Sequence, residues 1–276
     1  MKAYFEIIRP FNTIFVALTI LFGAFFHSHN YSIYAIIFAI FSAGFISAAG
    51  YVINDFYDIQ IDKINRPDRV LPSNRMRPKV AFWYAIILLF LGIIFGFLTQ
   101  KSGCIFLALL NSFLMFYYAK SLKKKFLFGN LVVAYAAGSA FIFGAISNSN
   151  LKNVFVVSIV AFLYTLVREI VKDMEDVEGD IKENSSTLPI ILGKKVAAYL
   201  TIIPILMIFF FLNYKFIFHG LNIYKIVINP FNYIVTLPLL ILFFLYSNNL
   251  KAKFLHKISL IMKLDMLLYL VGVWFI

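Results

Sequence analysis

Charged residues are scarce in this 276-residue sequence, and acidic residues are the scarcest of them. Only 14% of the residues are charged, 13 are Asp or Glu, and 62% are hydrophobic. A soluble domain needs a more polar surface, so this composition excludes an ordinary soluble protein and indicates a membrane protein. Cysteine is almost absent, and the single Cys104 excludes an intrachain disulfide.

Several common catalytic patterns are also missing. The sequence has no Ser/His/Asp nucleophile set, no Gly-rich phosphate loop and no paired cysteine motif. What it has instead are apolar stretches close to the ~20 residues that cross a bilayer. They lie at 12–27, 31–53, 80–99, 103–119, 129–147, 151–171, 196–213, 230–247 and 256–276. We therefore expect an all-α, polytopic membrane protein with nine transmembrane helices in a bundle, forming a single domain over residues 1–276.

The basic residues predict the orientation of this bundle. Lys and Arg in short loops resist translocation and mark the cytoplasmic side. If the N-terminus is cytoplasmic, 21 of the 25 basic residues lie on that side, and only Lys101, Lys152, Lys215 and Lys225 lie on the other. Topology and attraction to anionic lipid thus account for the net charge of +12, and they leave little reason to expect nucleic-acid binding.

Topology does not explain where the acidic residues lie. Eleven of the 13 fall into two clusters, one just after the second apolar stretch and one at the end of the sixth. Asp55, Asp58 and Asp62 form a first aspartate motif with spacing i, i+3, i+7, and the same spacing recurs 118 residues later in a second aspartate motif of Asp173, Asp176 and Asp180. On a helix this spacing places three carboxylates on one face.

Like charges on one helix face repel, so the arrangement favours a bound cation. Mg²⁺ prefers oxygen ligands, takes one or two carboxylates per site and shares its remaining positions with water and substrate phosphates. A solvated helix end is the ordinary alternative for either cluster alone, but the exact repetition argues against it. Four intervening helices return the chain to the same side, so we expect an internal four-helix repeat with both motifs at one mouth.

At these residues the sequence resembles the UbiA superfamily of membrane prenyltransferases. The stretch N-D-F-Y-D-I-Q-I-D from Asn54 to Asp62 is similar to the first aspartate-rich motif of that family, and D-M-E-D-V-E-G-D from Asp173 to Asp180 is similar to the second. The resemblance implies a helical bundle open to the cytoplasm, in which Mg²⁺ bridges a polyprenyl diphosphate to both motifs. It also implies a multi-pass cell-membrane enzyme, with no obligate protein partner evident.

Two further segments resemble one branch of the superfamily. The opening M-K-A-Y-F-E-I-I-R-P-F-N and the loop D-K-I-N-R-P-D-R-V-L-P-S-N-R look like the archaeal enzymes that make the core ether lipid. That branch implies transfer from geranylgeranyl diphosphate to the free hydroxyl of geranylgeranylglyceryl phosphate. Asn74 stands where Gly is usual, but Asn tolerates the left-handed conformation. The family's Tyr-x-x-x-Lys motif is imperfect at Tyr118, and we assign the lysine role to Lys123.

Candidate site residues follow from the motifs and from the charge that each substrate carries. The six aspartates of the two motifs are the expected metal ligands, with Asn54 as a neutral donor or orienter. Cations could hold the leaving diphosphate where its charge develops, and a phosphorylated acceptor needs a second cationic site. Arg66, Lys123 and Lys172 are candidates for the diphosphate, and Arg69, Arg75, Arg77 and Lys120 for the acceptor phosphate. Asn12 is a candidate for the headgroup pocket or a helix cap.

Three other functions compete with this interpretation. Intramembrane carboxylates and parallel repeats also occur in secondary transporters, but transporter sites usually lie near the midplane rather than at one surface. A CDP-alcohol type of headgroup transferase needs a D-G pair that the first aspartate motif lacks. Within the superfamily, an aromatic acceptor, as in quinone biosynthesis, remains the alternative to the lipid acceptor.

Overall fold

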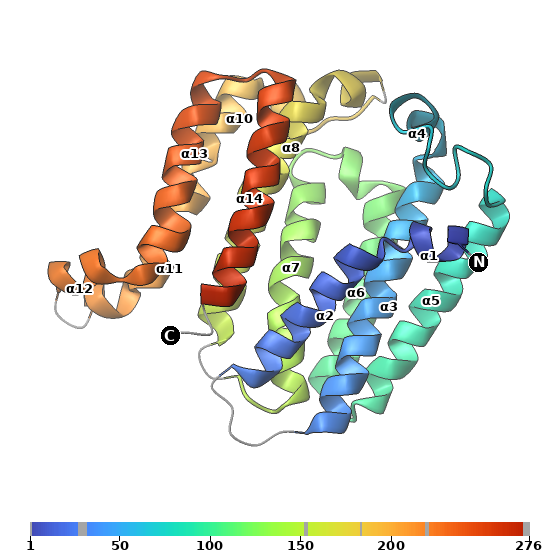
Figure 1. Ribbon diagram of the computed structural model, residues 1–276, viewed down its shortest axis with the longest axis horizontal. Coiled ribbons are helices and arrows are strands. Elements are labelled where there is room, and N and C mark those ends of the chain that lie inside the picture. The colour runs from blue at the N-terminus through green and yellow to red at the C-terminus, as the bar shows by residue number, and fades with distance from the viewer. Residues whose placement is uncertain (1, 27–31, 152–153, 183, 219–220, 273–276) are drawn as a thin grey trace. The chain divides into compact units, whose positions relative to one another are not determined.

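The computed structural model describes residues 2–26, 32–151, 154–182, 184–218 and 221–272. These residues are almost entirely helical, and beyond one isolated bridge between Lys125 and Ser186 they form no β-structure. The helices are α1 (Lys2–Ile7), α2 (Pro10–Phe25), α3 (Ile33–Tyr57), α4 (Ile59–Asn65), α5 (Pro78–Leu98), α6 (Ser102–Lys120), η1 (Leu122–Lys124), α7 (Phe128–Ser147), α8 (Val154–Lys182), α9 (Leu188–Leu192), α10 (Lys194–Leu200), α11 (Ile202–Phe218), α12 (Ile223–Ile228), the π-helical η2 (Asn232–Thr236), α13 (Leu237–Asn248) and α14 (Ala252–Gly272) (Figure 1).

Every expected apolar stretch coincides with helical structure, although some of their ends lie outside the described residues. Among the described residues, six helical segments are long and apolar enough to cross a membrane: α3, α5, α6, α7, α8 and the α10–α11 segment Lys194–Phe218. Two expected stretches correspond to shorter apolar helices, at Pro10–Phe25 and Asn232–Asn248. The last corresponds to α14, which carries several charged residues. The chain is thus a polytopic, all-helical membrane protein.

The chain forms two compact units, which we describe separately. The first consists of Met1–Lys123 and Ser139–Val154, and the second of Lys124–Gly138 and Phe155–Ile276. In the first unit, α3 packs closely along α5 (Figure 1). Ser42 of α3 donates a 2.7 Å hydrogen bond to the carbonyl of Gly92, where a side chain would clash with the Ile46 side chain. Small residues at Ser42 of α3 and Gly92 of α5 therefore allow the two helices to pack closely.

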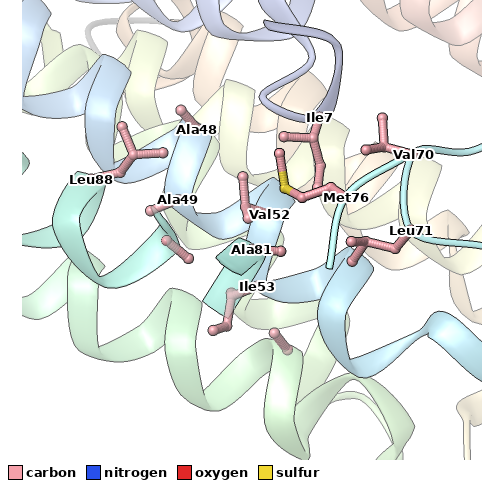
Figure 2. Close-up of a cluster of buried hydrophobic side chains, with 12 residues drawn as sticks. Ile7, Ala48, Ala49, Val52, Ile53, Val70, Leu71, Met76, Ala81 and Leu88 are labelled. Atoms are coloured by element: carbon pink, nitrogen blue, oxygen red, sulfur yellow. The ribbon is translucent and has the colours of Figure 1, made fainter. Parts of the chain in front are cut away.

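The core of the first unit includes the residues of α3 that immediately precede the first aspartate motif. It joins Val52 and Ile53 of α3 to Ala81 and Leu88 of α5 (Figure 2). The loop after α4 contributes Val70, Leu71 and Met76, and α1 contributes Ile7 (Figure 2). These side chains are buried. Because α1 and the 66–77 loop bury apolar side chains against α3, they are fixed beside the end of α3 that carries Asp55.

Polar contacts between helices organise the second unit. Tyr164 of α8 donates a 2.6 Å hydrogen bond to Asp265 of α14, and both side chains are buried. Asn213 of α11 accepts a hydrogen bond from Asn229 and exchanges hydrogen bonds with Asn232. Buried polar groups are stable only when they are paired in this way. The Tyr164–Asp265 bond joins α14 to α8, the helix that carries the second aspartate motif.

Candidate active site

The first aspartate motif lies where α3 passes into α4. Asp55 is in the last turns of α3, Asp58 is the junction residue with φ −94° and ψ 5°, and Asp62 is in α4. The expected single helix is therefore divided into two consecutive helices. Helical hydrogen bonding nevertheless crosses the junction, because the Asp58 amide donates to the Asn54 carbonyl at 3.0 Å and the Asp62 amide to the Asp58 carbonyl at 2.8 Å.

Two arginines neutralise the outer carboxylates of this motif. Arg9 Nη2 lies 2.6 Å from Asp55 Oδ1, and Arg69 Nη1 lies 3.2 Å from the same oxygen and 2.6 Å from Asp62 Oδ2. The Asp55 and Asp62 side chains are 6% and 7% exposed. Since one guanidinium nitrogen contacts both carboxylates, Asp55 and Asp62 converge on a single cation position.

Asp58 points to a different partner. Its Oδ1 pairs with the ammonium group of Lys123, and its Oδ2 accepts a 2.8 Å hydrogen bond from the Asn54 amide. Lys123 also donates to Asn54 Oδ1 at 3.2 Å. Asn54, Asp58 and Lys123 therefore form a closed triangle, and the structure brings the predicted Lys123 to the first aspartate motif.

The N-terminal segment holds this arrangement in place. Arg9 is the N-cap residue of α2, has a left-handed backbone with φ 49°, and lies 5.0 Å from the ring centre of Tyr51. Arg75 forms a two-pronged ion pair with Glu6 at 2.5 and 2.7 Å and donates to the Asp68 carbonyl at 2.6 Å. The hydrogen bond from Arg75 lowers the pKa of Glu6 below its ordinary value of 4.5.

The second aspartate motif lies on one continuous helix. α8 extends from Val154 to Lys182, so Asp173, Asp176 and Asp180 share one helix as the sequence predicts. Asp173 accepts a 2.8 Å hydrogen bond from the amide of Asn130 in α7. The predicted diphosphate ligand Lys172 lies 2.9 Å from Glu169, which also pairs with Arg168 at 2.7 Å.

Beside this motif, α14 contacts α8. His256 Nδ1 lies 2.7 Å from Glu175 Oε1, and Ser259 Oγ lies 3.5 Å from the other oxygen of Glu175. An open pocket adjoins these contacts and is lined by Glu175, Asp176, Ala252, Lys253, His256 and Lys257. The second aspartate motif therefore borders a pocket with basic side chains on its α14 wall.

The remaining predicted residues lie at or near the ends of helices. Arg66 caps the end of α4 and is exposed, as is Lys120 at the end of α6, where Tyr118 is half-buried. Asn12 is the third residue of α2, whose N-cap is Arg9, so the helix-cap interpretation of Asn12 is wrong. Asn74 has φ 58°, which confirms the left-handed conformation expected where Gly is usual.

Two contact residues were missed in the site residues predicted from sequence. Arg9 lies in the opening segment that resembles one branch of the superfamily, but it was not among the predicted site residues, although it contacts Asp55 directly. Asn130, which contacts Asp173, lies 118 residues after Asn12, the same offset that relates the two aspartate motifs. Extending the repeat comparison from the acidic residues to the asparagines would have found Asn130, whereas the resemblance around Arg9 does not show which residue its side chain contacts.

The donor set suits a hard divalent cation such as Mg²⁺. Asp55 and Asp62 already converge on one positive group, the Arg69 guanidinium. The metal-ligating atoms that the aspartates and Asn54 offer are carboxylate and amide oxygens. Among the described residues, no three acidic, His or Cys side chains are close enough to form a metal site by themselves. Mg²⁺ needs no such group, because it takes one or two carboxylates and completes its shell with water and phosphate.

Comparison with known proteins agrees with the fold. The model of the UbiA prenyltransferase family matches residues 16–267. A solved structure described as digeranylgeranylglyceryl phosphate synthase is similar with a TM-score of 0.80 and 30% identity, covering 99% of this chain and 96% of that one. A UbiA homologue from Archaeoglobus fulgidus, bound to DMAPP and Mg²⁺, has a TM-score of 0.74 at 19% identity, with 98% of each chain covered.

The fold and the paired motifs define an integral-membrane prenyltransferase. The chain belongs to the UbiA prenyltransferase family. It is 38% identical to the digeranylgeranylglyceryl phosphate synthase of Methanosphaera stadtmanae, over 99% of this chain and 98% of that relative. It is also 35% identical to the corresponding synthase of Methanococcus maripaludis, over 83% of this chain and 88% of the relative.

Proposed function

We propose that this enzyme transfers a geranylgeranyl group from geranylgeranyl diphosphate to the free hydroxyl of geranylgeranylglyceryl phosphate, in a Mg²⁺-dependent step of archaeal ether-lipid synthesis. The observation that carries the proposal is the doubled aspartate motif at the α3–α4 junction and on α8. Similarity to digeranylgeranylglyceryl phosphate synthases along nearly the whole chain supports the choice of donor and acceptor.

Each predicted residue has a role in this proposal. The aspartates of both motifs hold the metal ions, and Asn54 orients Asp58 through its 2.8 Å hydrogen bond. Lys123, Arg66 and Lys172 are assigned to the diphosphate. Lys120, Tyr118 and Asn12 are assigned to the acceptor side, as are Arg69 and Arg75, which act there through the carboxylates of Asp55, Asp62 and Glu6 that they hold. Arg9 joins this set because it contacts Asp55 and is 30% exposed, so it can exchange Asp55 for a phosphate oxygen.

The chemistry required is the departure of a diphosphate from an allylic carbon. Mg²⁺, when bound, would neutralise the negative charge of the leaving diphosphate. The residues of the chain position that group and contribute further positive charge at the place where negative charge develops. The helical bundle keeps water away from the allylic cation, so that the acceptor hydroxyl captures it.

The proposed topology follows the basic residues. Nine membrane-spanning segments with a cytoplasmic N-terminus place both aspartate motifs on the cytoplasmic side. α2, η2–α13 and α14 complete the six longer spans. We also propose a single functional domain over residues 1–276 and, within it, a parallel four-helix repeat. The repeat is supported by equal offsets of 118 residues, between the aspartates of the two motifs and between Asn12 and Asn130.

An acceptor screen tests the proposed function. Purified protein in detergent is supplied with geranylgeranyl diphosphate, Mg²⁺ and either geranylgeranylglyceryl phosphate or an aromatic acid, and products are identified by mass spectrometry. We expect product with the glyceryl phosphate only, and loss of that product with EDTA. Product only with the aromatic acid would assign the enzyme to quinone-type synthesis, and consumption of neither acceptor would overturn the proposal.

A further inference from the structure

The acceptor lipid carries a phosphate, but two of the guanidinium groups expected to bind it are already engaged. Arg69 contacts Asp55 and Asp62, and Arg75 contacts Glu6 through two nitrogens. A phosphate would have to displace these carboxylates before either arginine could bind it. The acceptor phosphate therefore needs basic side chains that border an aspartate motif without being paired to it.

The pocket between α8 and the start of α14 meets this requirement. Lys253, His256 and Lys257 have spacing i, i+3, i+4, so they lie on one face of the first turns of α14. They line the pocket together with Glu175 and Asp176 of α8. The pocket therefore has a basic wall on one helix and, on the other, a carboxylate of the second aspartate motif.

In this pocket the Glu175 side chain has hydrogen-bonding partners among the described residues, whereas the two lysine side chains have none there. Glu175 is held by His256 at 2.7 Å and by Ser259 at 3.5 Å, which fixes α14 against α8. In the part of the chain that the structure describes, neither Lys253 nor Lys257 forms an ion pair or a side-chain hydrogen bond, and both are exposed. Two ammonium groups one helical turn apart repel each other, so an anion between them stabilises the arrangement. The N-terminal end of α14 adds a further positive potential.

We propose that Lys253 and Lys257 form the binding site for the phosphate monoester of the acceptor lipid, and this rests on the function proposed above. In a glyceryl phosphate the phosphate and the free hydroxyl are attached to the same three-carbon unit, so the phosphate must bind beside the reacting carbon. A pocket that contains Asp176 satisfies this geometry, because Asp176 is a proposed ligand of the metal that holds the leaving diphosphate. Lysine binds phosphate as a compact point charge and needs no planar partner.

The test uses the full-length enzyme with both lysines replaced, K253Q/K257Q, and K251Q as the matched control. Lys251 is exposed on the same segment but does not line the pocket. In vesicles of neutral phosphatidylcholine we expect the KM for geranylgeranylglyceryl phosphate to rise about tenfold or more in the double variant. The KM for geranylgeranyl diphosphate should stay within about twofold, and K251Q should resemble the wild type.

Binding without turnover separates this inference from the proposed function. Thermal unfolding in detergent is measured with an alkylglyceryl phosphate and with the same alkylglycerol lacking phosphate. We expect the phosphate-dependent stabilisation of the wild type to disappear in K253Q/K257Q, whether or not the wild type forms product. Retention of that stabilisation, or an equal rise in both KM values, would overturn the assignment. An acceptor effect seen only in vesicles with anionic lipid would assign the lysines to bulk lipid headgroups and would also overturn it.

Discussion

The two aspartate motifs have identical spacing, but their first aspartates, Asp55 and Asp173, have different kinds of partner. In the first, each of the three carboxylates is paired with a cation: Asp55 with Arg9 and Arg69, Asp58 with Lys123, and Asp62 with Arg69. In the second, Asp173 is held by the neutral amide of Asn130, and the neighbouring Lys172 pairs with Glu169 instead. Asp55 and Asp173 thus occupy corresponding positions in the spacing, but one pairs with guanidinium groups and the other with a neutral amide.

This difference indicates different responses to a divalent cation. At the first motif, a metal ion would compete with guanidinium and ammonium groups that already contact the carboxylate oxygens. The displaced cations would remain close by and would be available to bind a diphosphate. At Asp173 a metal ion would compete with a neutral hydrogen bond from Asn130. We therefore expect the first motif to couple metal binding to substrate binding more strongly than the second.

The largest expected effect is loss of turnover when a central aspartate is removed from either motif. Asp58→Ala and Asp176→Ala should each lower kcat by about 100-fold or more, the scale seen when one preorganised electrostatic group is lost. Asp68→Asn, an exposed acid in the loop after α4, is the control and should leave turnover unchanged. Near-normal kcat in both alanine variants would mean that the aspartates are ordinary solvated residues at helix ends, with no role in turnover.

Lys123 offers a way to sharpen the comparison, because it contacts both Asp58 and Asn54 at the first motif. Lys123→Met removes the donor to Asn54 and Asp58. We expect kcat to fall about tenfold to 100-fold, with partial rescue in Lys123→Arg. The control is Lys79→Met, an exposed lysine at the start of α5. Steady-state kinetics at saturating Mg²⁺ measures both, and equal activity of the two methionine variants would contradict a role for Lys123.

The free energy of unfolding should respond differently to loss of a carboxylate in the two motifs, even if both variants lose activity. Asp55→Asn leaves Arg9 without its carboxylate and should lower the free energy of unfolding by about 1–2 kcal/mol. Asp173→Asn should be close to neutral, because the new side-chain carbonyl can still accept the hydrogen bond from Asn130. Thermal unfolding in detergent without added metal compares the two variants. An equal loss of stability would mean that the cations around Asp55 contribute no more than the amide does.

Much of this architecture could be predicted from sequence because it depends on periodicity. Apolar length located the six long apolar helices of the described residues, and the i, i+3, i+7 spacing placed Asp173, Asp176 and Asp180 on one helix. The same spacing did not reveal that α3 ends at Tyr57 and that α4 begins after Asp58. The sequence around Asp58 contains no Pro or Gly to indicate that junction.

The partners of the motif residues were harder to predict because they come from distant parts of the chain. Arg9 reaches Asp55 across 46 positions, and Asn130 reaches Asp173 across 43. Such contacts depend on how helices pack, and packing leaves little signal in a single sequence. A family pattern selected Lys123 as a candidate for the diphosphate, but its contacts with Asn54 and Asp58 became visible only in the structure.

The smallest expected effect concerns the contact between α1 and the loop that carries Arg69. Glu6 and Arg75 are exposed, and exposed ion pairs contribute little to stability. Because Arg75 holds the pKa of Glu6 below 4.5, the contribution of this pair is fully present above pH 4.5 and is lost as the pH falls through the lowered pKa. Thermal unfolding of wild type and Glu6→Gln should differ slightly at pH 7 and converge below pH 4.5. A difference that persists at low pH would mean that Glu6 acts through packing, and that α1 supports the first motif without this charge.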